Sequence, residues 1–403
     1  MKYISLTIVA LYLGIVASFA QTIKRDSVPY EKRKLKFEQA DLVNSYYHQD
    51  GNNSAVTGGI GTEKLTDFSN TFDLKLSRYD KIGRKHSYDF SLGIDTYTSA
   101  SSDNIGPNRQ NALTGPSYSD VRVYPSLSWD IANEQKGHSI GFNVSTSNEY
   151  DYSSVGGGIH FAKSSKDKNT DFDVKLQAFF DTWKVILPYE LRPDNNGGGG
   201  YLQNSTAPRN SFSAAFSLSQ VFSKTLQGLI MVEPSYQQGL LATRYQRVYF
   251  NNGGLKAEFL PSERVKLPIG ARLNYFIGDN VVIRSFLRYY TDNWGINSQT
   301  AELETSIKLT PFASVSPFYR YYQQTKSQYF AAYQQHSISQ EFFTSDYDLS
   351  KFHSSFFGAG VRFAPPAGVL GLSRLSMLEL RYGHYTRSNG LNSNIISMNL
   401  RFK

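Results

Sequence analysis

The stretch SIGFNVSTS (residues 139–147) decides the fold, because its side chains alternate between two kinds of chemistry. Ile140, Phe142 and Val144 are apolar, and the residues between them are small or polar. Successive side chains of a β-strand point to opposite faces, so this pattern predicts a strand with one apolar and one polar face. The same rhythm recurs at 72–77, 88–95, 120–131, 171–181, 211–219, 301–309 and 394–402.

Three features favour a membrane barrel over a soluble sandwich. The repeats are long enough to cross an outer membrane at a tilt, the polar face is rich in Ser, Gly and Asn, and short connections alternate with long ones. We therefore predict an all-β, transmembrane, antiparallel up-and-down barrel of about 16 strands. The strands are expected at 36–47, 66–77, 86–97, 119–131, 137–148, 152–163, 170–184, 210–222, 225–236, 263–276, 279–290, 295–309, 314–324, 353–363, 374–386 and 392–402.

The connections predict which side of the membrane each strand end faces. Short turns, expected in the periplasm, fall at 82–83, 133–134, 164–165, 223–224, 278–279 and 311–312, whereas long loops, expected outside the cell, fall at 48–65, 98–118, 185–209, 237–262 and 325–352. An even strand number places both termini in the periplasm. The last segment carries Ile396, Met398, Leu400 and Phe402 on one face. Such a strand suits pairing with the first strand and recognition by the barrel-assembly machinery.

The N-terminus predicts export to the cell outer membrane of a Gram-negative bacterium. A lysine at position 2 precedes the apolar run ISLTIVALYLGIVA (4–17), and Ser18 and Ala20 supply the small residues of a cleavage site. We expect a signal peptide at 1–20, a periplasmic segment at 21–35 and the barrel at 36–403. The run is too short for a stable span, no later stretch is apolar enough for a membrane helix, and the chain has no cysteine.

Several stretches resemble a family of Gram-negative outer-membrane barrels that is known only as a domain of unknown function. The matching stretches are YYHQDGNNSAVTGGIGTEKLTD (46–67), DTYTSASSDNI (95–105), SNEYDYSSVGGG (147–158), YYTDNWGINSQT (289–300) and PFYRYYQQTKSQYF (317–330). Members of that family are often encoded beside a thioredoxin-like protein and a periplasmic flavin-transferring lipoprotein. The resemblance implies a redox or flavinylated protein as a partner, and it carries over no functional residue.

Charge is distributed unevenly along the chain. Residues 201–403 hold 20 Lys and Arg against 11 Asp and Glu, whereas residues 21–200 hold 21 against 23. The alternation predicts a basic lumen wall on the late strands and an acidic lumen wall on the early strands. Opposed walls would orient polar solutes in a porin-like pore, while structural ion pairs in a filled lumen are the alternative. The basic wall comprises Arg272, Arg284, Arg288, Arg320, Arg362, Arg381 and Arg401, and the acidic wall comprises Asp73, Asp89, Asp95, Asp130, Asp171 and Asp173.

The sequence gives only weak indications of metal binding, catalysis or nucleic-acid binding. A group of acids near the loop ends offers oxygen ligands for calcium, but it lacks EF-hand spacing, and polar loop tips are the simpler interpretation; we predict no metal and no cofactor. The histidines fall in no nucleophile elbow or metal pair, so we predict no enzyme. The basic run Lys32-Arg33-Lys34 is too short to predict nucleic-acid binding. The acids are Asp50, Glu63, Asp95, Asp103 and Asp120.

Aromatic residues at the strand ends predict girdles at the two lipid headgroup levels. Tyr322 is expected to face the lumen, where it could stack a planar ligand such as a flavin, although a filler role is the simpler interpretation. Two functions remain open: a pore for small polar solutes, and a non-conducting structural or docking barrel for a redox or flavin-linked partner. The girdle residues are Tyr46, Tyr47, Tyr289, Tyr290, Trp294, Tyr319, Tyr321, Tyr322, Tyr382 and Tyr385.

Overall fold

A computed structural model describes residues 34–98, 119–192 and 205–403 of the chain. The chain divides into Met1–Lys34 and Leu35–Lys403, and the second unit is the barrel. The expected signal peptide at 1–20 and most of the expected periplasmic segment at 21–35 lie outside the described residues. Among the described residues, no helix combines the length and hydropathy that a bilayer span requires.

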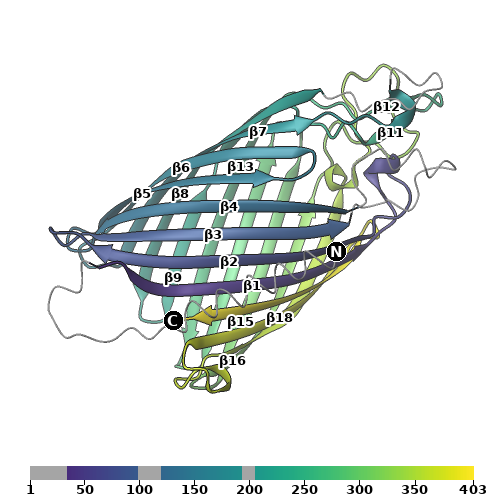
Figure 1. The fold of residues 1–403 in the computed structure, drawn as a ribbon. Helices are drawn as coiled ribbons and strands as arrows, with labels where there is room; N and C mark the ends of the chain where they lie inside the picture. The colour runs from purple at the N-terminus through teal and green to yellow at the C-terminus, as the bar shows by residue number, and fades with distance from the viewer. Residues whose placement is uncertain (1–33, 99–118, 193–204) are drawn as a thin grey trace. The chain divides into compact units, whose positions relative to one another are not determined.

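The barrel wall is one antiparallel sheet whose strands follow chain order (Figure 1). Apart from β9 and β10, which both lie between β8 and β13, each strand of the wall pairs with its neighbours in chain order, as an up-and-down barrel requires. The strands are β1 (Lys36–Asp50), β2 (Leu65–Tyr79), β3 (Lys85–Thr98), β4 (Ser119–Asn133), β5 (His138–Asn148), β6 (Tyr152–Ser164), β7 (Thr170–Lys184), β8 (Thr206–Ser223), β9 (Leu226–Val232), β10 (Ser235–Gly239), β13 (Glu263–Ile277), β14 (Val281–Asp292), β15 (Asn297–Thr310), β16 (Ala313–Gln324), β17 (Phe352–Phe363), β18 (Leu375–Arg387) and β19 (Asn392–Phe402).

β9 and β10 are two halves of one interrupted strand. Both pair with β8 on one side and with β13 on the other. The break falls at Glu233 and Pro234, where proline has no backbone N–H to give to the ladder. Counted as one strand, the two halves give a closed barrel of 16 strands, which confirms the predicted number and fold class.

The first and last strands close the barrel. β1 pairs with β19 from Ala40↔Phe402 to Asp50↔Asn392 without a break in register. Arg401 Nε lies 2.7 Å from Asp41 Oδ1 across this seam, on the inner face of the wall. Closure leaves the described sheet without an open edge, as a wall surrounded by hydrocarbon requires.

The outer face of the wall is apolar and exposed. Val144, Leu287 and Leu303 are 60%, 61% and 50% exposed, although each lies in a paired strand. The residues on either side of them point into the barrel, and all of these except Phe286 are polar. An exposed apolar wall of this extent needs hydrocarbon around it, so the strands span a membrane.

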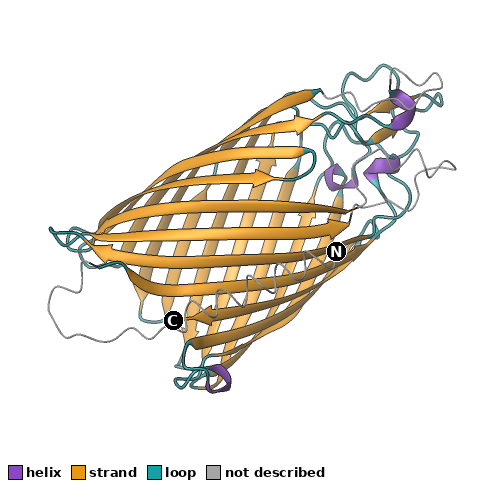
Figure 2. Ribbon diagram, viewed as in Figure 1, coloured by secondary structure: helices purple, strands orange, loops and turns teal. Residues whose placement is uncertain are grey.

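The two ends of the barrel differ (Figure 2). At the turn end, short connections join β2 to β3, β4 to β5, β6 to β7, β8 to β9, β13 to β14 and β15 to β16, as predicted; only residues 364–374, with the 3-10 turn η5 (Val369–Gly371), are longer. At the loop end, the expected connections at 48–65, 237–262 and 325–352 are long, those at 98–118 and 185–209 lie partly outside the described residues, and 149–151, 293–296 and 388–391 are short, as the predicted strand bounds imply. Both barrel termini, Lys36 and Phe402, lie at the turn end.

Four loop-end segments, residues 51–64, 185–192, 240–262 and 325–351, pack together as a loop-end cap. The cap contains a small two-stranded sheet of β11 (Arg247–Tyr249) and β12 (Leu255–Ala257), with 3-10 turns η2 (Ala55–Thr57), η3 (Tyr189–Leu191) and η4 (Tyr347–Leu349). Val248, Phe250 and Phe343 form a buried cluster within it. The cap therefore has a hydrophobic core of its own, separate from the wall.

Arg247 joins three of these segments. Its guanidinium donates to both carboxylate oxygens of Glu190, at 2.5 and 3.1 Å, and to the carbonyl of Val56 at 2.9 Å. The Arg247 side chain is 6% exposed, so the pair is shielded from water on the arginine side. The raised pKa of Arg247, which its bonds to Glu190 maintain against burial, keeps the clamp charged.

Candidate functional site

The lumen of the barrel is the first candidate site, and strand alternation decides what faces it. On β14, Leu287 and Tyr289 are exposed on the outer wall, so Arg284 and Arg288 point inward. The same reasoning turns the remaining predicted arginines, on β13, β16, β17, β18 and β19, toward the lumen. The polar faces of the late strands thus share one enclosed space.

The late-strand arginines meet acids that the sequence analysis did not single out. Glu304 on β15 accepts from Arg284 Nη1 at 2.7 Å and from Arg381 Nη2 at 2.6 Å. Glu302, two residues earlier on the same face, lies 3.2 Å from Arg320 Nε. The basic wall is therefore interleaved with carboxylates, and four of its seven arginines (Arg284, Arg320, Arg381 and Arg401) are in ion pairs.

The other three arginines have no ion-pair partner among the described residues. Arg272 lies over the ring of Phe286, 5.5 Å from its centroid, and Arg288 and Arg362 are exposed side chains. Even the paired Arg284 and Arg320 are 46% and 44% exposed. Inward-facing side chains keep such exposure only where water can reach them, so the lumen has room for solvent beside this wall.

The early-strand acids are more scattered. Asp89 lies 3.6 Å from Lys75 Nζ, and His160 lies between Asp130, at 3.4 Å, and Asp173. Asp95 accepts from Ser69 Oγ at 2.6 Å and from the Tyr124 hydroxyl at 2.9 Å. Asp73 and Asp171 also face inward by alternation.

Two aromatic rings lie over glycines in the early wall. A Cβ atom added to Gly93 would meet the Tyr124 ring at 2.0 Å, and one added to Gly156 would meet Phe179 at 2.4 Å. Both glycines face the lumen by alternation, so the rings lie flat against the wall. Glycine is therefore needed at these positions for the ring to pass close to the backbone.

The acids expected at the loop end do not gather into one site. Asp103 lies outside the described residues, and Asp95 is in the lumen with the bonds given above. Within the described residues, the structure instead brings the carboxylates of Asp120, Glu149 and Asp151 within 4.8 Å of one another. Hydrogen bonds from the protein already occupy part of this group: Asp120 accepts from two backbone N–H groups, and Glu149 accepts from Tyr97.

The girdle prediction is wrong at four residues: Trp294 faces protein, and alternation places Tyr47, Tyr290 and Tyr385 on the inward faces of their strands. Tyr46, Tyr289, Tyr319, Tyr321 and Tyr382 are exposed on the outer wall, but Trp294 is only 2% exposed. The Trp294 ring packs with Ala242 and Leu260 at the base of the cap, and its indole N–H donates to the Glu263 carbonyl at 3.0 Å. The short β14–β15 connection turns this ring into protein rather than toward lipid.

Tyr322 faces inward, as predicted, but its hydroxyl donates to Gln324 Oε1 at 2.6 Å and its ring packs against Phe352. These contacts hold the side chain against its own wall. The stacking of a planar ligand on it stays a prediction.

A buried carboxyl inside the cap was not identified from the sequence. Glu258 is 3% exposed and accepts from the backbone N–H of Thr243 at 2.6 Å and from the Thr344 hydroxyl. Burial, with a smaller effect from Asp346, raises the pKa of Glu258 to about 8. The group is therefore largely protonated at neutral pH, held by hydrogen bonds rather than by an ion pair.

The sequence of residues 95–389 matches the protein family described as "Protein of unknown function (DUF3570)". The match runs from within β3 to just beyond β18 and covers most of the chain. The chain belongs to this family. The match confirms the family resemblance inferred from the sequence. The description of the family assigns no activity to any residue.

No curated protein matches the chain. Solved structures that resemble it include a BenF-like porin from Pseudomonas fluorescens Pf-5 (TM-score 0.40, 10% identity, covering 90% of this chain and 98% of that one). OccK1 (OpdK) of Pseudomonas aeruginosa has a TM-score of 0.42 and 8% identity, covering 90% of this chain and 97% of that one. OccD3 (OpdP) of the same species has a TM-score of 0.43 and 6% identity, covering 91% of each chain. These likenesses are remote, and the assignment of the barrel rests on the strand pairing of this chain.

Proposed function

We propose that the protein is an outer-membrane pore for small polar solutes, with a preference for anions. The observation that carries the proposal is the exposure of inward-facing arginines inside a closed wall. A lumen that admits water beside unpaired Arg272, Arg288 and Arg362 offers a path on which hydrated anions are favoured. Low-dielectric walls strengthen that preference by focusing the field of the arginines.

The orientation follows from the two ends of the barrel. Outer-membrane barrels carry short turns toward the periplasm and longer loops toward the cell exterior. The turn end, with both barrel termini, is then periplasmic, and the loop-end cap is outside the cell. Outer-membrane lipid surrounds the apolar wall, and recognition of β19 by the barrel-assembly machinery stays a prediction.

Planar bilayers test the pore directly. The purified barrel is expected to give stepwise conductance, and a salt gradient is expected to give a reversal potential that favours the anion. R272Q/R288Q/R362Q should move that potential toward zero, because it removes three arginines that form no ion pair within the described residues. R78Q is the matched control, since Arg78 lies on the outer face at the turn end, over the Tyr88 ring.

Docking of a partner protein is the second candidate function, because the cap is a folded structure. Its hydrophobic clusters and the Arg247 clamp hold the loops in one arrangement, as a docking platform requires. A redox or flavin-linked protein is the partner that the family resemblance suggests. Silent bilayers, with a folded barrel verified on the same sample, would contradict the pore and leave docking as the function to test by co-purification.

A further inference from the structure

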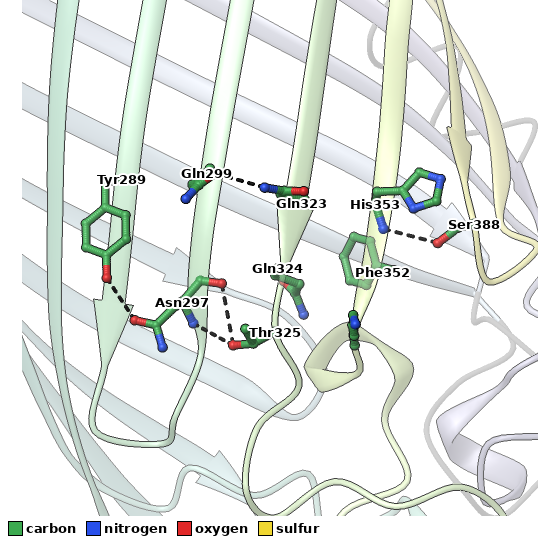
Figure 3. A pocket seen from close by; sticks show the side chains of 10 residues that line it. Tyr289, Asn297, Gln299, Gln323, Gln324, Thr325, Phe352, His353 and Ser388 are labelled. Carbon is green, nitrogen blue, oxygen red and sulfur yellow. Dashed lines mark hydrogen bonds between the residues drawn. The ribbon is translucent and has the colours of Figure 1, made fainter.

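A hollow of about 420 Å³, lined mostly by residues of polar types, lies on the outside of the barrel at the loop end of β14–β17 (Figure 3). Tyr289, Gln299, Gln323 and His353 form a row across it, because each pairs in register with the next. Their neighbours on the same strand faces are the exposed Leu287, Leu303, Tyr321 and Phe357. The row therefore belongs to the lipid-facing side of the wall, where its polar side chains end the apolar surface.

The hollow presents hydrogen-bond donors. Tyr289 donates to Asn297 Oδ1 at 3.0 Å, and Gln323 Nε2 donates to Gln299 Oε1 at 2.8 Å, as the dashed lines in Figure 3 mark. These bonds use the amide oxygens of Asn297 and Gln299, and within the described residues no bond from their NH₂ groups is seen. An amide NH₂ can only donate, so the unfilled bonding capacity here suits an acceptor-rich ligand.

The charges around the hollow also favour an acceptor-rich ligand. Lys351 and His353 line the hollow, and its ten lining residues include no Asp or Glu. Lys351 is exposed and has no ion-pair partner among the described residues. Asp348, an acid of the same loop, is bound to Arg387 at 2.6 Å. A lysine with no ion pair in the described part of the chain, beside amide donors, suits a phosphate group.

A second hollow of about 550 Å³ continues from the first along the outer wall. The two share Tyr289, Gln299 and Gln323. The second is mainly apolar, and small side chains, Ala271 and Ala301, form its floor between larger ones. A polar, cationic pocket that opens into an apolar groove is complementary to one kind of molecule, an amphiphile with an anionic head.

We infer that these two hollows bind a phosphorylated lipid of the surrounding leaflet, with its phosphate at Lys351 and His353 and an acyl chain in the groove at Ala271 and Ala301. The inference rests on the membrane placement proposed above and is independent of conduction. Tyr321, an exposed aromatic residue of the outer wall, lines the second hollow, and aromatic side chains of this kind favour the level where headgroup and hydrocarbon meet.

Native mass spectrometry of the full barrel in detergent tests the inference. The probes are diphosphoryl lipid A and the same lipid without its phosphates, so that only the phosphate differs. Wild-type protein is expected to retain the phosphorylated lipid about tenfold better, and K351Q/H353Q should lose that advantage. K64Q is the matched control, because Lys64 is an exposed loop-end lysine that does not line either hollow.

Two further arms separate the parts of the ligand. A301W fills the groove from the lipid side and should weaken retention of the phosphorylated lipid while leaving Lys351 and His353 in place. Millimolar inorganic phosphate should not displace the lipid, because a free ion gains nothing from the groove. Equal retention of both lipids, an equal loss in K64Q, or displacement by inorganic phosphate would each overturn the inference. Bilayer conductance measured on the same variants distinguishes such a failure from failure of the pore.

Discussion

Glu304 in the lumen wall and Glu258 in the loop-end cap are both enclosed by protein, yet each is satisfied differently. Glu304 lies between the guanidinium groups of Arg284 and Arg381 and is 15% exposed. Glu258 is 3% exposed and has hydrogen-bond donors but no ion-pair partner among the described residues. The wall thus keeps its charges and pairs them beside water, whereas the cap favours the neutral form of its acid.

The largest effect is expected from E304Q. The substitution keeps the side chain's shape but leaves Arg284 and Arg381 without their shared anion. We expect a loss of about 1–2 kcal/mol in the free energy of unfolding, since both arginines remain partly solvated. The temperature at which the folded barrel converts to the unfolded form in detergent measures this loss. An unchanged transition would show that the pairs contribute nothing to stability.

The cap gives the second effect, which depends on pH. Because the folded pKa of Glu258 lies above its ordinary value of 4.5, its contribution to cap stability is complete below pH 4.5 and is lost as pH rises through about 8. Limited proteolysis of residues 240–262 should therefore become at least several-fold faster between pH 6 and pH 9.

E258Q is the control for that prediction. Glutamine retains a hydrogen-bonding side chain of the same length but cannot lose a proton. Its cleavage rate should depend far less on pH than that of the wild type. Equal pH dependence in the two proteins would assign the effect to another group.

The smallest effect is expected in the early wall. Lys75 and Asp89 are 3.6 Å apart, and their side chains are 50% and 36% exposed. D89N should change the unfolding free energy by less than about 0.5 kcal/mol, because exposed pairs contribute little. The same heat-conversion assay measures it beside E304Q. A loss as large as that of E304Q would erase the distinction between the two walls.

Alternation made most of the barrel predictable. A period of two fixes both the strand and the face of each residue, so the number of strands and the inward direction of the predicted charges follow from the sequence. The same alternation places Glu302 and Glu304 on the inward face of β15. They were missed because acids were expected only on the early strands. Pro234 was likewise a visible reason to divide the strand expected at 225–236.

The contacts within the cap could not be predicted from the sequence, for a physical reason. Glu258 and Thr344 are 86 residues apart in sequence, and no periodic pattern connects one loop with another. Trp294 was assigned to the lipid interface because it follows a strand, yet packing with Ala242 and Leu260 decides its place. The lipid-facing hollows also depend on the register of β14 to β17, which a single strand's pattern does not contain.

The seam between β1 and β19 has a consequence for how the protein is made. Asp41 and Arg401 are 360 residues apart in sequence, so the two edges of the sheet can meet only after the entire chain has been synthesised. Until then the growing ribbon exposes unpaired backbone at both margins, which invites association with other chains. Export must therefore deliver the polypeptide whole and shielded, and a nascent chain that stops before its last eleven-residue strand cannot seal its margins.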